Sequence, residues 1–439
     1  MEVKIEKLVY GGEGLGHAEG AAVFVPFVLP DETVSIVPIE RKRKFVRGRL
    51  ERLLTASPAR VAPPCPYFHS CGGCNYQHIP YEAQLRYKVE ILRETFRRLG
   101  HMDWDGPIQA HASPAWAYRN RAQWKIRVPQ KDARLEHAAG PRDDRETETH
   151  GFGIGYFRAG STALVPVAEC AITSPLLQRT LQRLHEIVLA GALPLSLREM
   201  EAFTNAEDER LLITASFRAL PTDAGGWAAQ FRTIVPEIES ILFQDVAQEQ
   251  MELFGPGFLV YRASGYSYRV GHMSFFQVNR FLLAELIETV VGNSSGSLAL
   301  DLFCGVGLFT LPLAAHFERV IAVESNPASV RDLASNAAMN RAEIESNNSE
   351  VHEFLRGFRG APELVVLDPP RAGVSAESLA RISRLLPSRI TYVSCDPSTL
   401  ARDAALLARN GYEVSEIHLF DLFPQTFHIE TVTKLTLRT

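Results

Sequence analysis

The first 54 residues alternate short apolar runs with glycine-rich turns. Val3–Tyr10, Ala21–Leu29, Thr33–Ile39 and Phe45–Leu53 are apolar or alternating, which is typical of β-strands. The segment 11–16 is rich in glycine and is expected to form a tight turn. About five short strands in this length favour a barrel of the OB type, a fold that often binds RNA. We expect this barrel to occupy residues 1–54.

The middle of the chain mixes helical and strand patterns. From Tyr81 to Leu99 apolar residues recur every three or four positions, and Gly100 follows, which predicts a helix over 81–99. Strand-like runs come later, and the polar stretch 130–150 is expected to be a loop. These runs are Trp124–Val128, Gly153–Phe157, Arg210–Phe217 and Phe258–Tyr261. We expect residues 55–270 to form a mixed α+β domain, with the helix packed on the third domain.

Strands and helices alternate from about residue 275 onward. This alternation predicts a doubly wound parallel sheet whose sites lie at the carboxyl ends of the strands. The expected fold class is therefore α/β, with a Rossmann-like domain over residues 271–439. The predicted strands are Ser297–Leu302, Arg319–Val323, Leu364–Leu367, Ile390–Val393 and Val414–Leu419.

The composition narrows the class of protein. A chain of 439 residues is too long for a single core, so two or three domains are expected. No apolar run is long enough to cross a bilayer, and the first residues do not resemble a signal peptide. We expect a cytoplasmic monomer without membrane contact, in which the six cysteines are thiols or metal ligands and not disulfides.

The net charge of −5 argues against a nucleic-acid-binding protein, but the basic residues are unevenly distributed. Two short stretches are crowded with them, and the second is interleaved with Tyr118 and Trp124. Basic patches with nearby aromatic rings suit a phosphate backbone and unstacked bases, although solvated strand faces would give the same pattern. The first stretch contains Arg41, Lys42, Arg43, Lys44, Arg47, Arg49 and Arg52, and the second Arg119, Arg121, Lys125, Arg127, Lys131 and Arg134.

A strand that feeds a glycine turn is the first sign of a cofactor site. Asp301–Gly307 ends in Cys-Gly-Val-Gly, and the following strand ends at Glu324, whose carboxylate can accept both hydroxyls of a ribose. The third glycine of the dinucleotide fingerprint is missing. This pattern favours S-adenosylmethionine over NAD, because S-adenosylmethionine has no phosphate to be cradled.

The sequence Asp-Pro-Pro-Arg, at Asp368–Arg371, closes the next predicted strand. Proline fixes its own φ angle and keeps the preceding residue extended, so this loop is rigid. A carboxylate on a rigid loop at the functional edge of the sheet is suited to hold a cofactor or a planar base.

Cys395 and Glu430 supply a nucleophile and a base. Carbon 5 of uracil attacks a sulfonium methyl group poorly, but a thiolate added to carbon 6 makes carbon 5 nucleophilic. A base must later remove the proton of carbon 5 so that the thiol can leave. A cysteine at a strand end can also be a simple packing residue, and this is the expectation for Cys304.

Four further cysteines could bind a metal. Cys65, Cys71 and Cys74 lie in a loop rich in proline and glycine, and Cys170 follows far downstream. Four thiolates can hold zinc or an iron–sulfur cluster. Zinc sites usually take two Cys-x-x-Cys pairs, so three close cysteines with one remote cysteine favour a cubane cluster.

These motifs resemble the RNA uracil-5 methyltransferases of the RumA/TrmA type. The glycine turn, Asp-Pro-Pro-Arg, Ser394–Asp403 and His428–Thr431 all match, and Ser274–Asn279 is a further match. The strands around Gly14–Gly16 resemble the TRAM domain of this family. The resemblance extends over essentially the whole chain.

The resemblance implies a role for each matching residue. Cys395 would be the nucleophile and Glu430 the base. The cofactor S-adenosylmethionine would contact Gln277, Phe303, Gly305, Gly307, Glu324 and Asp368, together with Leu308, where some relatives carry Asn, and Glu350, the candidate for the acidic position after the next strand. Cys65, Cys71, Cys74 and Cys170 would ligate a 4Fe–4S cluster with a structural role.

The implied substrate is RNA. In relatives that have both the TRAM domain and the cluster, the usual target is a uridine of 23S rRNA. Three alternatives remain: a tRNA T-loop uridine-5 methyltransferase, a methyltransferase of small molecules, and a non-enzymatic RNA-binding protein with a decayed methyltransferase domain. The basic stretches disfavour the second, and the presence of Asp368, Cys395 and Glu430 disfavours the third.

Overall fold

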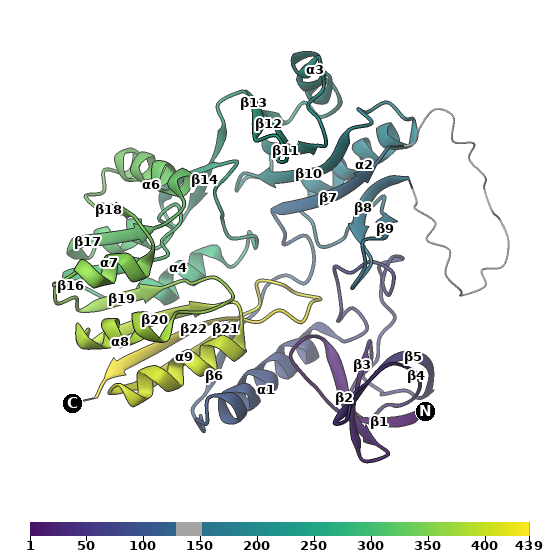
Figure 1. Cartoon of the computed structure of the whole chain (residues 1–439), viewed down its shortest axis with the longest axis horizontal. Coiled ribbons are helices and arrows are strands. Elements are labelled where there is room, and N and C mark those ends of the chain that lie inside the picture. The colour runs from purple at the N-terminus through teal and green to yellow at the C-terminus, as the bar shows by residue number, and fades with distance from the viewer. Residues whose placement is uncertain (129–151, 439) are drawn as a thin grey trace. The chain divides into compact units, whose positions relative to one another are not determined.

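The computed structural model describes residues 1–128 and 152–438 (Figure 1). The chain divides into two compact units. The first combines residues 1–64, 74–115 and 261–439, and the second combines 65–73 and 116–260. We call them the catalytic unit and the central unit. The whole of the expected loop 130–150, with Lys131 and Arg134, lies outside the described residues. Among the described helices, none is long and apolar enough to cross a membrane.

The N-terminal strands close into a barrel, as predicted. Alternate residues point inward, so Val3, Ile5, Val23, Val25 and Val34 form its core. Gly16 is required where β1 and β2 cross closely, because a Cβ atom there would lie 2.2 Å from the carbonyl oxygen of Lys4. The strand order is β1-β2-β3-β5-β4, with β1 (Glu2–Leu8), β2 (Glu13–Ala18), β3 (Ala21–Pro26), β4 (Thr33–Arg41) and β5 (Phe45–Thr55).

An eight-stranded sheet forms the centre of the catalytic unit. Its order is β18-β17-β16-β19-β20-β22-β21-β6. The strands are β6 (Ile108–His111), β16 (Gly296–Leu302), β17 (Phe317–Glu324), β18 (Glu345–Asn348), β19 (Leu364–Leu367), β20 (Arg389–Ser394), β21 (Tyr412–Phe420) and β22 (Glu430–Leu437). Before the sheet, β14 (Phe258–Ala263) and β15 (Tyr266–Gly271) form a separate hairpin.

The prediction of an entirely parallel sheet was wrong at one side. β22 runs antiparallel to both β20 and β21. The link from β21 to β22 covers only residues 421–429 and contains no helix, so the chain reverses direction instead of crossing over. As a result, the first residue of β22 lies at the edge where the parallel strands end.

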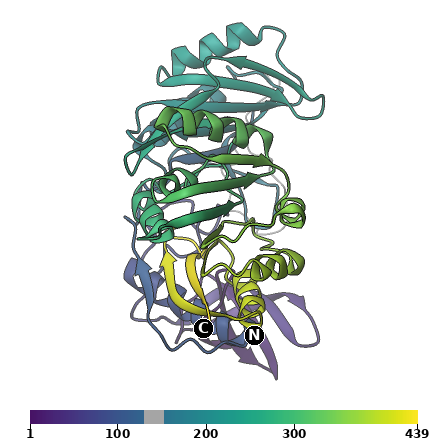
Figure 2. The same ribbon diagram turned by 90° about the vertical axis from the view of Figure 1, so that its left-hand side faces the viewer.

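Helices cover both faces of this sheet, and they flank the strands in Figure 2. On one face α4, α5 and α6 contact one another in series, and on the other α7, α8, α9 and α1 do so. The Rossmann-like fold of the C-terminal domain is thus confirmed. The helices are α1 (Tyr81–Leu99), α4 (Leu283–Val291), α5 (Thr310–Ala314), α6 (Pro327–Asn340), α7 (Val351–Gly357), α8 (Ala376–Arg384) and α9 (Pro397–Arg409).

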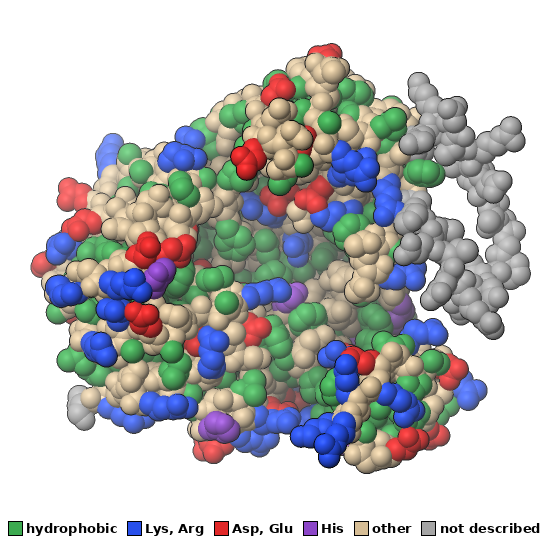
Figure 3. All heavy atoms as spheres, in the orientation of Figure 1, with side chains coloured by type: hydrophobic (Ala, Val, Ile, Leu, Met, Phe, Trp, Pro, Cys, Tyr) green, Lys and Arg blue, Asp and Glu red, His purple; other side chains and the backbone are tan. Residues whose placement is uncertain are grey.

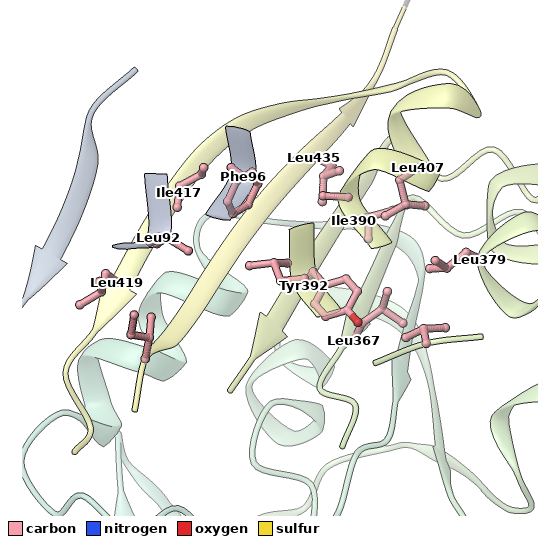
Figure 4. Packing of buried hydrophobic residues seen from close by; sticks show 14 of the residues in the cluster. Leu92, Phe96, Leu367, Leu379, Ile390, Tyr392, Leu407, Ile417, Leu419 and Leu435 are labelled. Carbon is pink, nitrogen blue, oxygen red and sulfur yellow. The ribbon is translucent and has the colours of Figure 1, made fainter. Parts of the chain in front are cut away.

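Helix α1, with the bounds predicted from its periodicity, belongs to the catalytic unit. Leu92 and Phe96 are fully buried in its main core, and Figure 4 shows Phe96 beside Ile417 of β21. Lys88 on this helix is also buried and donates a hydrogen bond of 2.7 Å to Asp421. A buried ammonium must be paired with a carboxylate, so this contact fixes the register of α1 against the segment that leads to β22.

The central unit is a seven-stranded sheet with two helices. Its core includes the fully buried Trp124 and the apolar faces of both helices. The strand order is β13-β12-β11-β10-β7-β8-β9. The elements are β7 (Arg121–Arg127), β8 (Gly153–Phe157), β9 (Leu164–Pro166), α2 (Pro175–Leu189), β10 (Leu197–Thr204), β11 (Leu211–Phe217), α3 (Ala224–Ile234), β12 (Ile238–Asp245) and β13 (Gln250–Phe254). The mixed α+β character predicted for residues 55–270 is found here, but the predicted bounds were too wide, because residues 74–115 and 261–270 belong to the catalytic unit.

Candidate active site

The edge of the catalytic sheet brings the predicted reacting residues together. Asp368 follows β19, Cys395 follows β20, and Glu430 begins β22. Ser394 pairs with Thr431 in the antiparallel register, which places Cys395 and Glu430 next to each other at the strand ends. The predicted nucleophile and the predicted base, 35 positions apart, therefore share one site because β22 reverses the chain direction.

The thiol of Cys395 is half-buried, and its pKa is raised to about 11. Burial is the main cause, and the carboxylates of Glu430 and Asp368 add to it. The guanidinium of Arg371 acts in the opposite direction, both through its charge and through a hydrogen bond to the thiol. Without bound substrate, Cys395 is therefore a protonated thiol at neutral pH.

Glu430 is buried and its pKa is raised well above the ordinary value for a glutamate. Burial is again the largest cause, Asp368 raises the pKa further, and Arg371 lowers it. A carboxyl group with a raised pKa is a stronger base once it is ionised. This property suits Glu430 for removing a proton from carbon.

Arg371 is the functional residue that sequence reasoning missed. The motif Asp368–Arg371 was singled out for its carboxylate and its prolines, and Arg371 received no role. In the structure its guanidinium lowers the pKa of both Cys395 and Glu430, and it lies 3.5 Å from Nδ1 of His428. Its presence in a rigid loop beside the cysteine strand was the available signal.

Three carboxylates form the adjacent, cofactor end of the site. Asp301 is fully buried and accepts a hydrogen bond of 2.5 Å from Thr310 Oγ1. The pKa of Asp301 is raised to about 7, mainly by burial and also by Glu324, although the hydrogen bond from Thr310 opposes the rise. The pKa of Asp368 is also raised to about 7, by burial and then by Asp301 and Glu324. Crowded carboxylates favour a positively charged ligand, and a sulfonium cofactor carries such a charge.

The glycine turn has the backbone shape that a close ligand requires. Phe303 and Gly305 have positive φ angles of 66° and 55°, and a Cβ atom on Gly305 would meet open space. Gly307 is held tightly, because a Cβ atom there would lie 2.5 Å from Leu333. Glu324 holds the turn by accepting a hydrogen bond of 3.0 Å from the backbone N–H of Gly305. The turn thus leaves backbone accessible beside the carboxylates.

The remaining predicted cofactor residues differ in their surroundings. Gln277 is buried in a segment fixed on both sides, by Ser274 donating to Asp332 and by Asn279 donating to Ser113. Leu308 is buried, and its carbonyl oxygen accepts from Tyr268.

Glu350 is exposed at the start of α7. At the end of β18, the side chain of Asn348 donates to the carbonyl oxygens of Glu324 and Ser325. The polar residue that this strand end presents beside Glu324 is therefore Asn348.

The first basic stretch lies on the barrel with all of its side chains exposed. Arg41, Lys42, Arg43 and Lys44 occupy the β4–β5 region, where Figure 3 shows Lys and Arg side chains on the barrel surface. Arg41 pairs with Glu19 at 3.8 Å. Exposed pairs of this kind are weak, so these charges can be redirected to a phosphate backbone.

The interpretation of the second basic stretch was wrong in one respect. Tyr118 and Trp124 are fully buried and pack in the interior, so they cannot stack on bases. Arg121 already has partners within the protein, since its guanidinium lies over the ring of Phe203 at 4.5 Å and pairs with Glu201. In this strand the alternation that places basic residues on one face places the aromatic residues in the core.

Three of the four predicted metal ligands lie in the central unit. The pKa of Cys71 is raised to about 11, mainly by burial and in part by the neighbouring Cys170 and Cys65, so the three thiols are close enough to influence one another. The backbone N–H of Gly73 donates to Sγ of Cys71 at 3.4 Å. Cys74 belongs to the catalytic unit. Within the described ranges, no three Cys, His, Asp or Glu side chains are arranged as a preformed metal site.

Comparison with known proteins agrees with this site. Residues 258–438 match the tRNA (uracil-5-)-methyltransferase family, and residues 1–50 match the TRAM domain. The chain is 31% identical to the 23S rRNA (uracil(1939)-C(5))-methyltransferase RlmD of Pseudomonas putida, over 98% of this chain and 92% of that protein. The chain belongs to the RNA uracil-5 methyltransferase family. The resemblance drawn from the motifs is thereby confirmed.

Other members of the uracil-5 methyltransferase family align over the full length. An uncharacterized RNA methyltransferase of Aquifex aeolicus is 30% identical, over 100% of this chain and 99% of its own. Among solved structures, the tRNA (uracil-54, C5)-methyltransferase of Pyrococcus abyssi, in complex with S-adenosyl-L-homocysteine, is 26% identical with a TM-score of 0.75. That match covers 99% of this chain and 100% of the other.

Proposed function

We propose that this protein transfers a methyl group from S-adenosylmethionine to carbon 5 of a uridine in RNA, through a covalent bond between Cys395 and carbon 6 of the base. The observation that carries the proposal is the meeting of Cys395, Glu430 and Arg371 at one strand edge, beside the carboxylates Asp301 and Asp368. Family membership supports the same reaction.

The chain's own residues handle the covalent step and the proton of carbon 5. Cys395 gives up its thiol proton to solvent as Sγ bonds to carbon 6, and the adjacent guanidinium of Arg371 favours the negative charge that this step requires. The electron pair of the 5,6 double bond moves to carbon 5, which attacks the methyl group as the sulfur–methyl bond of the cofactor breaks and S-adenosylhomocysteine is released. The carboxylate of Glu430 then removes the proton of carbon 5, the double bond re-forms, and the thiolate leaves.

The proposed cofactor contacts follow the geometry of the strand ends. Glu324 would hold the ribose, Phe303 and Gly305 would present the open turn, and Asp368 would face the sulfonium charge. S-adenosylmethionine supplies an electrophilic methyl group when it is bound. We also propose contacts from Gln277, Gly307 and Leu308. For the position after β18, the side-chain contacts favour Asn348 over Glu350.

We propose 23S rRNA as the substrate. Support comes from the full-length relatives named as 23S rRNA methyltransferases and from the TRAM domain with its exposed basic residues. A tRNA is the second candidate, because the tRNA methyltransferase of Pyrococcus abyssi also aligns over the whole chain. Methylation of fragments of each RNA, followed by mapping of the modified uridine, separates the two.

We further propose that Cys65, Cys71, Cys74 and Cys170 hold a 4Fe–4S cluster that orders the loop around residues 65–74. The mutual influence of the three thiols in the central unit supports this, and Cys74 is included from its Cys-Gly-Gly-Cys spacing. Methyl transfer needs no electron, so the cluster would be structural. The protein is proposed to act as a cytoplasmic monomer.

Two variants test the covalent mechanism. Cys395→Ala should abolish methyl transfer while RNA and cofactor still bind, and retained turnover would exclude Cys395 as the nucleophile. Glu430→Gln should accumulate a protein–RNA adduct that migrates slowly on a denaturing gel, because the proton of carbon 5 can no longer be removed. Cys304→Ser is the matched control for Cys395, since Cys304 is a buried thiol in the glycine turn.

A further inference from the structure

A cavity of about 510 Å³ opens in the central unit, beside β7 and β8. Its described lining contains four cationic side chains and a single carboxylate, so the cavity is strongly positive. Strand residues such as Ile126 and Leu164 add apolar surface. The polar and aromatic side chains of the lining include Lys125, Arg127, Phe157, Arg198, Glu199 and Arg218.

The positive charges are crowded and held in place. The pKa of Arg198 is lowered, first by burial and then by the charges of Arg218 and Arg127. Nη1 of Arg198 donates to the carbonyl oxygens of Leu195 at 2.6 Å and of Leu197 at 2.7 Å, which fixes the guanidinium before any ligand arrives. Like charges held together destabilise the fold, and a bound anion would relieve this repulsion.

An aromatic ring and a second cavity extend the site. Lys125 pairs with Glu199, and its ammonium lies 5.5 Å from the ring centre of Phe157. Lys125 and Phe157 also line a neighbouring cavity of about 360 Å³, which reaches Gly72 and Gly73. The two cavities therefore lie side by side and share part of their lining.

We propose that the larger cavity binds one phosphodiester and the adjoining base of a single-stranded segment of the RNA substrate, apart from the uridine that reacts. The inference rests on the proposed function. Arg127, Arg198 and Arg218 would surround the phosphate, because guanidinium groups match its geometry. The base would stack on Phe157, and the strand would continue into the second cavity. A rigid aromatic beside converging arginines is the arrangement that single strands require.

The test compares two double variants that lose the same charge. Arg198→Gln with Arg218→Gln removes two cavity arginines, and Arg179→Gln with Arg210→Gln removes two exposed arginines of the same unit that lie outside the cavity. Binding of a short fluorescein-labelled oligouridylate is followed by anisotropy at several salt concentrations. The cavity variant should bind about tenfold more weakly, and its salt slope should fall by about 0.7 for each lost phosphate contact.

Stability measurements decide whether a loss of binding is specific. The loss of the Arg198 hydrogen bonds and the relief of like-charge repulsion act in opposite directions, so the thermal midpoint should change by no more than a few degrees. A midpoint lowered by about ten degrees or more would show that the arginines mainly stabilise the fold and would overturn the proposal, as would equal binding by the two double variants. Phe157→Leu keeps apolar volume without a ring and should weaken binding at least about fivefold. Unchanged binding by Phe157→Leu would refute the proposed stacking of a base on Phe157.

The binding assay is independent of turnover. Failure of the chain to methylate any uridine would refute the proposed function while leaving the cavity measurement valid. If the cavity variants bound RNA normally and the parent protein still methylated its substrate, only the proposed RNA-binding role of the cavity would be refuted.

Discussion

The hydroxyl of Tyr10 donates a hydrogen bond to the backbone carbonyl oxygen of Cys395, with 3.4 Å between the two oxygens. Tyr10 lies in the turn between the first two strands of the barrel, so the barrel contacts the loop that carries Cys395, the proposed nucleophile. The ring of Tyr10 also packs edge-on against Phe427, three residues before Glu430, at 5.7 Å. One barrel residue therefore supports both reacting segments.

Tyr10→Phe should lower kcat about three- to tenfold while the KM for S-adenosylmethionine stays unchanged. The variant keeps the ring contact with Phe427 and loses the hydrogen bonds of the hydroxyl to the Cys395 carbonyl and to Asp396, each of which contributes about 0.5–1.5 kcal/mol. Steady-state methylation at saturating RNA and cofactor measures the effect, and the thermal midpoint should stay within a few degrees of the parent. Tyr87→Phe, which removes a hydroxyl from α1, is the matched control. Equal kcat for Tyr10→Phe and Tyr87→Phe would show that Tyr10 does not position Cys395.

The reactivity of Cys395 should depend on Arg371. Because Arg371 lowers a thiol pKa that already stands at about 11, Arg371→Gln should raise this pKa further. Alkylation of Cys395 by iodoacetamide at pH 8 should then slow several-fold, and the midpoint of its pH profile should move upward. Peptide mapping by mass spectrometry follows the residue directly, with Cys395→Ser as the background. Faster alkylation in Arg371→Gln would mean that Arg371 raises the pKa of Cys395, which would exclude the proposed charge effect.

The sequence allowed Cys395 and Glu430 to be predicted as a reacting pair because both residues belong to short motifs at the ends of apolar strands. It could not show why Cys395 and Glu430 meet. That depends on the antiparallel direction of β22, which follows from a connection too short for a crossover. β18 was missed for a different reason: Glu345–Asn348 is polar and fully exposed, so its strand carries no apolar pattern.

Contacts between residues far apart in the sequence could not be predicted from sequence patterns either. The contact from Tyr10 to Cys395 joins positions 385 residues apart, and nothing local to either residue predicts it. For the basic stretch around Trp124, the local pattern was visible but was interpreted wrongly. Its alternating pattern was read as a surface with stacking rings, whereas the period of the strand buries Trp124 and exposes only the basic side.

The buried Asp301 should make the stability of the protein depend on pH. Its folded pKa is raised to about 7, above the ordinary value of 3.8, so the folded state binds a proton more tightly than the unfolded chain. The stabilisation is complete below about pH 4 and is lost as the pH rises through about 7. The free energy of unfolding should therefore fall between pH 5 and pH 8. Asp368, which also titrates near 7, contributes in the same direction.

Asp301→Asn removes one of these titrations, so the variant should gain stability relative to the parent as the pH rises from 5 to 8. Urea unfolding at several pH values measures the difference. Saturating S-adenosylmethionine should flatten the profile of the parent, since a nearby positive charge favours the ionised carboxylates. The cofactor should flatten the pH profile of unfolding free energy less in Asp301→Asn than in the parent. Parallel profiles for parent and variant would mean that Asp301 is not titrating in this range, and that the carboxylates do not act as one charged site for the cofactor.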